Sequence, residues 1–142
     1  MKNETLVGDG RVVSYNWSLY VQDKQLFRAW VLDKKINNVI AINRGGLVFG
    51  VSVSNLLRLP LNIIGTKDKI PYWILDNTEP GVSLIVDDIY DSGTTMKNAL
   101  DFVPNSIGYT LLASTTQEEK DERVTYSRLV TGEGQMDWPW FG

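Results

Sequence analysis

The sequence predicts one α/β domain with a mostly parallel central sheet. Short, continuous apolar runs alternate along the chain with longer segments whose apolar residues recur at helical spacing. Strands that alternate with helices favour parallel pairing, because each helix returns the chain across a face of the sheet. The 142 residues contain no internal repeat or linker, so they suit a single domain, 1–142.

The first half of the chain is expected to alternate between helices and strands. Apolar residues recur at helical spacing over 17–36, and Asn16 or Ser18 is the expected cap of this helix. A second helix is predicted at 47–59, ending before Pro60, because four apolar residues fall on one side of it. Those four residues are Val48, Val51, Leu56 and Leu57. The buried strands predicted from continuous apolar runs are 38–42 and 61–65.

The second half is expected to continue this alternation and to end in a packed tail. The segment 66–81 is partly polar with two prolines, and it is expected to hold a loop and a hairpin strand. The charged stretch 117–123 is expected to be solvated, whereas 132–142 is too aromatic to be a free end. The remaining predicted elements are a helix at 93–102 and strands at 83–88, 106–114 and 124–130.

Composition excludes several kinds of chemistry. The chain has no Cys, which excludes disulfides, Cys-based metal sites and Cys nucleophiles. It also has no His, the commonest general base and the commonest metal ligand. Any catalysis must therefore rest on carboxylates, Lys, Arg, hydroxyls, backbone amides or a bound ion.

Charge and hydropathy indicate a cytoplasmic protein. The net charge is −3 and there is no basic tract, so general binding to nucleic acid is not expected. No apolar run approaches the roughly 18 residues that a membrane span needs, and the first residues, "MKNETLVGDG", lack a signal core. We therefore expect a cytoplasmic protein without nucleic-acid or membrane partners.

Two unusual turns follow buried strands, at the sheet edge where ligands of open parallel sheets bind. They are "NRGG", 43–46, and "DDIYDSGTT", 87–95. The second turn carries three acids at the end of a buried strand. Buried charge is costly unless it is paired, metal-bound or bound to a ligand, so this turn is the first candidate for a site.

Three other motifs that would explain these acids do not fit. A Walker B strand would need a G-x-x-x-x-G-K-[ST] loop elsewhere, and the sequence has none. A calcium loop starting at Asp87 would need Gly at its sixth position and Glu at its twelfth, which are Ser92 and Asn98. A G-x-G-x-x-G dinucleotide fingerprint after a strand is also absent.

The remaining interpretation is a phosphate-binding cup at 91–95. This turn offers consecutive backbone N–H groups, hydroxyls and a helix N-terminus, and Gly93 lets the backbone approach an anion. Asp87 and Asp88 lie one turn away, where they would meet vicinal hydroxyls of the same ligand. A ribose 5-phosphate has this shape.

The segment 83–95 resembles the phosphoribosyl-pyrophosphate (PRPP) signature of the type I phosphoribosyltransferases, with Ser83 and Tyr90 as mild departures. That signature is an apolar strand, two acids, two apolar positions and a D-[ST]-G-x-[ST] turn. The stretch "IAINRGGLVFG", 40–50, resembles the S-R-G-G-L-x-x-G pyrophosphate loop of the xanthine-guanine (6-oxopurine) branch. The final "DWPWFG" is similar to the Pro-Trp tail of that branch, and the likeness covers about 17–113 in order.

The resemblance implies the type I phosphoribosyltransferase fold, a mostly parallel central sheet flanked by helices with a small hood formed by the chain ends. It implies Mg²⁺-dependent transfer of phosphoribosyl from PRPP to a nucleobase, a step of purine salvage that yields a nucleoside monophosphate and pyrophosphate. Members of the family are usually homodimers or homotetramers. Two alternatives stay open, a non-catalytic PRPP- or nucleotide-binding regulator on the same fold and a transferase for a non-purine acceptor.

The resemblance also assigns the donor site residue by residue. Asp87 and Asp88 would hold the ribose hydroxyls and Mg²⁺, and Asp91 would be the general base beside the nucleobase, although helix capping alone would also explain it. The residues for the 5-phosphate are Asp91, Ser92, Gly93, Thr94 and Thr95. Those for pyrophosphate are Asn43, Arg44, Gly45, Gly46 and Lys67, with Lys69 as a further candidate. A cis peptide is expected at Asn43–Arg44, and 66–81 would form a lid over the sugar.

The acceptor site departs from the family pattern. The hood is expected at about 114–142 with the N-terminal segment, and its base-binding residues are Ile89, Ser114, Gln135, Met136, Asp137 and Trp138. Ser114 stands where the branch has a Lys for the purine 6-oxo group, and Gln135 stands where it has a stacking aromatic. Trp138 would stack instead, unless it and Trp140 only anchor the tail. We therefore expect changed or relaxed base choice.

Overall fold

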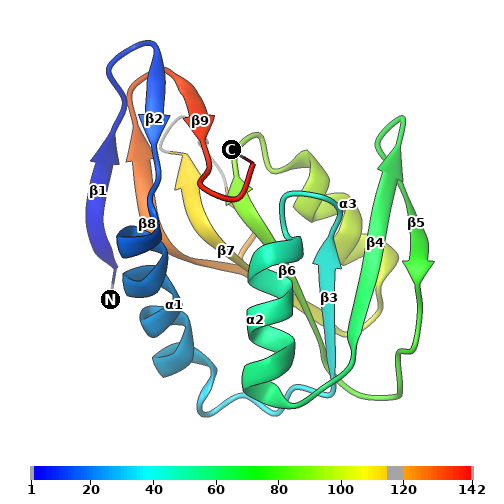
Figure 1. Cartoon of the computed structure of the whole chain (residues 1–142). Helices are drawn as coiled ribbons and strands as arrows, with labels where there is room; N and C mark the ends of the chain where they lie inside the picture. Colours follow the sequence, from blue (N-terminus) through cyan, green and yellow to red (C-terminus); the bar gives the residue numbers. More distant parts are fainter. Residues whose placement is uncertain (1, 115–119, 142) are drawn as a thin grey trace.

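The computed structural model is a layered α/β structure with one large and one small sheet (Figure 1). It describes residues 2–114 and 120–141. The helices are α1 (Trp17–Val31), α2 (Leu47–Leu57) and α3 (Thr94–Phe102). The strands are β1 (Asn3–Val7), β2 (Val12–Ser14), β3 (Asn38–Ile42), β4 (Leu61–Lys67), β5 (Ile70–Leu75), β6 (Ser83–Tyr90), β7 (Ser106–Ser114), β8 (Val124–Thr131) and β9 (Gln135–Asp137).

The large sheet has seven strands in the order β1-β8-β7-β6-β3-β4-β5, and all its pairings are parallel except β4 with β5. Strands β2 and β9 pair in parallel as the small sheet, which lies above the end of the large one in Figure 1. The predicted α/β class with a mostly parallel sheet is confirmed. Among the described residues, no helix has the length and apolar character needed to cross a membrane.

Side chains alternate along the strands and build one core on each face of the sheet. Val39 and Ala41 of β3 pack in the core with α1 and α2, whereas Ile40 and Ile42 pack in the core under α3. Every residue of β3 is buried. A strand covered on both faces has to be apolar throughout, which explains the continuous apolar run that predicted it.

The helix ends follow local sequence signals. The Asn16 side chain accepts a hydrogen bond from the N–H of Leu19 at 2.8 Å, so Asn16 caps α1 as expected. Helix α1 ends at Val31 rather than near residue 36, because the chain turns there to enter β3. Helix α2 ends with Arg58 in the left-handed conformation, two residues before Pro60.

The predicted buried side of α2 is wrong in part. Val51 and Leu56 are exposed, and the buried residues are Phe49, Gly50 and Val53. The cause is close packing on β3, since a Cβ at Gly50 would lie 2.6 Å from the Ala41 Cβ. Because Gly50 has no side chain, α2 approaches the sheet closely at this residue. Phe49 and Val53 then face the sheet, and Val51 faces solvent.

Three short strands were not predicted, namely β1, β2 and β9. The hairpin strand expected within 66–81 exists as β5, the antiparallel edge of the sheet. From the segment expected to form the hood, β8 joins the large sheet and β9 pairs with β2. Residues 117–119 of the charged stretch lie outside the described residues.

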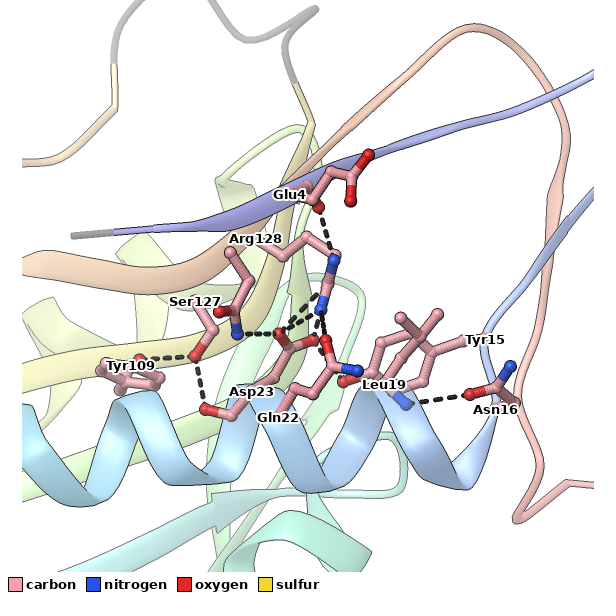
Figure 2. Close-up of polar contacts among 10 residues, drawn as sticks. Glu4, Tyr15, Asn16, Leu19, Gln22, Asp23, Tyr109, Ser127 and Arg128 are labelled. Carbon is pink, nitrogen blue, oxygen red and sulfur yellow. Dashed lines mark hydrogen bonds and ion pairs between the residues drawn. The ribbon is translucent and has the colours of Figure 1, made fainter.

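A buried ion pair fixes α1 to the far end of the sheet (Figure 2). The Asp23 carboxylate on α1 is fully buried, and Arg128 of β8, 3% exposed, reaches it with an N···O distance of 3.0 Å. Tyr15 donates a hydrogen bond to the same carboxylate at 2.6 Å, and Asn3 donates another at 2.7 Å. The Arg128 guanidinium also donates to the Glu4 carbonyl oxygen, so β1, α1 and β8 meet at one cluster.

This cluster also holds the aromatic tail after β9 in place. Burial, together with the neighbouring Asp23 carboxylate, raises the pKa of Tyr15 far above its ordinary value, so Tyr15 stays a hydrogen-bond donor. Its ring packs edge-on against Trp138, with 5.1 Å between ring centroids. The aromatic tail after β9 is therefore tied through Tyr15 to a fully partnered buried ion pair.

Candidate active site

The carboxyl ends of the parallel strands bring the two unusual turns together. The turn 43–46 follows β3 and leads into α2, and the turn 91–93 follows β6 and leads into α3. Strands β3 and β6 are direct neighbours in parallel register, with Ala41 opposite Val86. Both turns therefore lie at one edge of the sheet, as the strand order requires.

The two acids at the end of β6 are buried side by side. Asp87 and Asp88 are 8% and 7% exposed, and Asp87 accepts a hydrogen bond from the backbone N–H of Asp88 at 2.8 Å. Burial raises the pKa of both carboxyl groups, and the Asp88 charge raises that of Asp87 further. Such a pair is stabilised by any cation or hydrogen-bond donor that reaches it.

The turn after β3 lies against this acid pair. A Cβ at Gly45 would come within 2.5 Å of an Asp88 carboxylate oxygen, and one at Gly46 would come within 2.6 Å of the Val86 carbonyl oxygen. Only glycine fits such approaches, so the two consecutive glycines let the loop touch β6. The Asn43–Arg44 peptide is cis, as expected, and Asn43 and Arg44 are both exposed beside the glycines.

The turn predicted to bind phosphate is an open turn before α3. Gly93 adopts a φ of +86° and is the N-cap of α3, without a side-chain capping bond. Capping therefore does not explain Asp91, which is exposed along with Ser92, Thr94 and Thr95. A cavity of about 270 Å³ is lined here by Asp87, Ile89, Tyr90, Asp91, Ser92, Gly93, Thr95 and Met96.

Tyr90 lines this cavity beneath Gly93. In the sequence, it stands out only as a departure from the family pattern. A Cβ at Gly93 would lie 2.5 Å from the Tyr90 hydroxyl oxygen. That oxygen accepts a hydrogen bond from the backbone N–H of Asp121 at 3.1 Å. Tyr90 therefore joins the cup to the segment before β8, and the sequence signal for it was the bulky ring where an aliphatic is usual.

A second cavity, of about 390 Å³, adjoins the cup and shares Tyr90, Ser92 and Gly93 with it. Lys97 and Lys120 line this cavity, together with Thr94 and Asp121. No sequence pattern indicated that Lys120 lies here, because it belongs to a charged stretch that is expected to be solvated. The two ammonium groups bring positive charge to the side of the cup.

The lysines proposed for pyrophosphate lie on the β4–β5 hairpin. Lys67 is the last residue of β4 and is exposed at the same edge of the sheet as the turn 43–46. Lys69 lies at the hairpin turn, where its carbonyl oxygen accepts a hydrogen bond from the Asn98 side chain at 2.9 Å. The hairpin is thus attached to α3, and both ammonium groups remain at its exposed tip.

The predicted base-binding residues come from two separate parts of the structure. Ile89 of β6 and Ser114 at the end of β7 are half-buried at the edge of the large sheet. Gln135, Met136 and Asp137 form β9, where Gln135 and Asp137 are exposed and Met136 is half-buried.

Aromatic rings surround the tail that follows β9. Trp138 is 8% exposed and stacks on Trp140, with 5.0 Å between ring centroids. Trp140 also packs against Trp17 and Tyr20 of α1, at centroid distances of 5.8 and 5.5 Å. Both tail tryptophans thus anchor the tail, and the sequence had not singled out Trp17 or Tyr20.

One polar atom in this aromatic cluster lacks a partner. The Trp140 indole nitrogen is buried and makes no hydrogen bond. Within the described residues, it is the buried side-chain nitrogen or oxygen for which this holds. The next residue, Phe141, turns its ring toward the other half of the site, where the Arg44 guanidinium carbon lies over it at 4.7 Å from the centroid. The tail therefore touches the turn after β3.

Comparisons with known proteins fit this geometry. Neither a protein-family model nor a curated protein matches the sequence. Among solved structures, a purine phosphoribosyltransferase from Pyrococcus horikoshii superposes with a TM-score of 0.73, at 20% identity over 91% of this chain and 93% of that one. The chain has the type I phosphoribosyltransferase fold.

Two further solved structures resemble the chain over most of its length. A xanthine-guanine-hypoxanthine phosphoribosyltransferase from Helicobacter pylori gives a TM-score of 0.63 at 17% identity, covering 92% of this chain and 94% of that one. A hypothetical protein from Neisseria gonorrhoeae with bound ppGpp gives 0.66 at 16% identity, covering 100% and 91%. Both alignments span nearly the whole of each chain.

Proposed function

We propose that this protein is a phosphoribosyltransferase that moves phosphoribosyl from PRPP to a nucleobase in an Mg²⁺-dependent reaction, giving a nucleoside monophosphate and pyrophosphate. The observation that carries the proposal is the contact of the turn 43–46 with the acid pair at the end of β6, directly beside the cup 91–95. A pyrophosphate loop, two carboxylates for a ribose and a 5-phosphate cup then follow one another along one sheet edge.

The cup would hold the 5-phosphate through backbone N–H groups of Ser92, Gly93, Thr94 and Thr95 and through the nearby hydroxyls. These residues are at the start of α3, whose N-terminal dipole favours an anion. Asp87 and Asp88 would accept hydrogen bonds from the ribose hydroxyls.

The acid pair also suits Mg²⁺. Two adjacent buried carboxylates whose pKa values are raised by burial gain from a divalent cation. The described residues contain no group of three or more His, Cys, Asp or Glu that would hold a metal alone. Mg²⁺ typically uses one or two carboxylates, waters and substrate phosphates, so Asp87 and Asp88 are the residues that would hold it. When bound, the ion would supply positive charge that offsets the negative charge of the leaving pyrophosphate.

The reaction is a displacement at C1 of the ribose. A base nitrogen forms the new bond to C1, the bond from C1 to pyrophosphate breaks, and pyrophosphate leaves with the electron pair. Arg44 and the amides of Gly45 and Gly46 would take up its charge, with Lys67 at the rim. The exposed Asp91 carboxylate would accept the proton from the base, and the aromatic tail would exclude water.

The acceptor is proposed to be a purine, with a base choice that differs from that of the xanthine-guanine branch. Ser114 offers a hydroxyl where that branch offers a charged Lys, and the exposed Gln135 offers an amide in place of a ring. Ile89, Met136, Asp137 and Trp138 would complete the contacts. A site that reads its substrate by a few hydrogen bonds can change specificity by orders of magnitude through such replacements.

A second candidate is a nucleotide-binding protein without turnover. The neighbour solved with bound ppGpp aligns with 100% of this chain, which favours nucleotide binding as the alternative. We further propose a cytoplasmic homodimer or homotetramer, as is usual for this kind of enzyme, without nucleic-acid or membrane partners. The net charge of −3 agrees with the absence of a nucleic-acid partner.

One assay distinguishes the transferase from the nucleotide-binding alternative. The protein is incubated with PRPP, Mg²⁺ and a panel of purine and pyrimidine bases, and released pyrophosphate is measured. Release with one or more purines supports the proposal, whereas release with pyrimidines alone refutes the purine acceptor. Binding of PRPP or ppGpp by calorimetry without release for any base would refute the enzyme and favour the nucleotide-binding alternative. Light scattering on the same sample tests the oligomeric state.

A further inference from the structure

The contact between Phe141 and Arg44 joins two parts of the site that are far apart in the sequence. Arg44 belongs to the turn after β3, which the proposed function assigns to pyrophosphate, and Phe141 belongs to the tail proposed to cover the base. The guanidinium carbon lies over the ring at 4.7 Å from its centroid, within the range of a cation–π interaction.

Backbone hydrogen bonds fix the segments that carry Phe141 and Arg44, so the contact is part of the fold. The N–H of Phe141 donates to the Trp138 carbonyl oxygen at 3.3 Å, which closes a turn over the buried Trp138 ring. On the other side, the Arg44 carbonyl oxygen accepts the N–H of Leu47 at 3.1 Å at the start of α2. Both side chains are therefore attached to ordered backbone before any ligand binds.

The chemistry of the guanidinium leaves room for an anion in this arrangement. Its five N–H donors lie in the plane of the group, while an aromatic ring interacts with its face. A ring over that face therefore leaves donors at the rim free for a phosphate, and it reduces the number of orientations that the long Arg side chain samples.

We propose that Phe141 is a positioning residue for the departing pyrophosphate, acting through Arg44. This role rests on the proposed function. The ring of the anchored tail holds the Arg44 guanidinium in place, which strengthens the binding of pyrophosphate.

The test is the affinity for Mg²⁺-pyrophosphate, measured by titration calorimetry on the full chain. Phe141→Leu keeps an apolar side chain but removes the aromatic face, and we expect affinity to fall about two- to fivefold, the loss of one exposed cation–π contact. Phe141→Tyr should restore the wild-type value. Phe102→Ala is the matched control, since Phe102 of α3 is a similarly exposed Phe that packs against Trp73 of β5.

A double-mutant cycle decides whether the effect passes through Arg44. In an Arg44→Gln background, Phe141→Leu should cause no further loss of affinity. A full loss in that background, or an unchanged affinity of the single Phe141→Leu variant with an unaltered melting temperature, overturns the role of Phe141. A wild-type protein that binds no Mg²⁺-pyrophosphate overturns the proposed donor site itself, which is a different result.

Discussion

The proposed donor half and the proposed acceptor half of the site are built from different kinds of residue. The donor half consists of two short turns whose glycines, hydroxyls and acids are contiguous in the sequence and lie at neighbouring strand ends. The acceptor half consists of aromatic rings contributed by the segment before α1, by α1 itself and by the tail after β9. In the proposed function, backbone amides would bind the phosphates, carboxylates would bind the ribose hydroxyls, and aromatic rings would border a flat acceptor.

The two halves also treat buried charge differently. Asp23, near the hood, is neutralised by Arg128 and accepts two further side-chain hydrogen bonds. Asp87 and Asp88 have no ion pair with Lys or Arg within 2–114 and 120–141. The buried charge of Asp23 is therefore already neutralised, whereas a cation or other ligand that reaches Asp87 and Asp88 would increase the stability of the fold.

The largest effect is expected when the chemistry is removed but donor binding is kept. Asp91→Asn removes the proposed proton acceptor and leaves an exposed side chain of similar size, so turnover should fall about 10²–10⁴-fold. PRPP binding should change much less. Pyrophosphate release and PRPP titration measure the two quantities, with Asp33→Asn as the control at an exposed Asp elsewhere. Equal losses of turnover and binding would remove the base role from Asp91.

The next largest effect is expected in the support of the hood. Arg128→Met leaves the Asp23 carboxylate buried without its cation, which should lower the free energy of unfolding by about 3–5 kcal/mol. The matched control is Arg123→Met, whose guanidinium pairs with Asp101 and Asp121 at a more exposed position. That control should cost about 1 kcal/mol or less. Thermal unfolding of both variants checks the contrast, and similar melting temperatures would contradict it.

A smaller effect of opposite sign is expected at the acid pair. Asp88→Asn removes a buried charge, so without ligand its melting temperature at pH 8 should exceed that of the wild type by about 2–4 °C, or roughly 1 kcal/mol. Burial raises the folded-state pKa of Asp88 above its unfolded value near 4, so the folded wild type binds the extra proton between these two values. Wild-type stability therefore falls as pH rises through that window.

The advantage of Asp88→Asn should accordingly shrink as the pH is lowered from 8 toward 4. Melting curves at several pH values measure this trend directly. A melting temperature below that of the wild type at pH 8 would show that the carboxylate already stabilises the fold without ligand. The same variant should bind PRPP with Mg²⁺ more weakly, because the cation loses a carboxylate ligand.

A comparably small effect is expected under the proposed phosphate cup. Tyr90→Phe removes the acceptor for the Asp121 N–H, which should cost about 1 kcal/mol of stability and weaken PRPP binding a few-fold. Tyr72→Phe is the control, because Tyr72 is exposed on β5. Denaturant unfolding and PRPP titration are the measurements. An unchanged PRPP affinity would mean that the hydroxyl supports the fold but not the cup.

The same contrast explains what the sequence could predict. Strands β3 and β7 are predicted to the residue, because strands buried on both faces are continuous apolar runs between turns. The donor turns were recognisable because each is one contiguous stretch with its own backbone chemistry. Their contact through Gly45 follows from the parallel order of β3 and β6.

The acceptor half was harder to predict because it is non-local. Strand β2 has three residues and its partner β9 lies at the other end of the chain, so neither has a periodic pattern of its own. The pairing of β1 with β8 is hidden for the same reason. Tyr15 and Trp17 precede or begin a helix, and nothing near them in the sequence indicates the tryptophans that they meet.

The Asp23–Arg128 pair also has a consequence for synthesis on the ribosome. The two residues are 105 positions apart, so at about 5–20 residues per second Asp23 waits roughly 5–20 s for its counter-ion. During this interval α1 carries a carboxylate that can only stay hydrated, and β1 has no strand to pair with. We expect nascent chains stalled before β8 to be cut by protease within α1, and chains stalled beyond the tail to resist. The N-terminal quarter of the protein is thus synthesised first, but its contacts with β8 would form last.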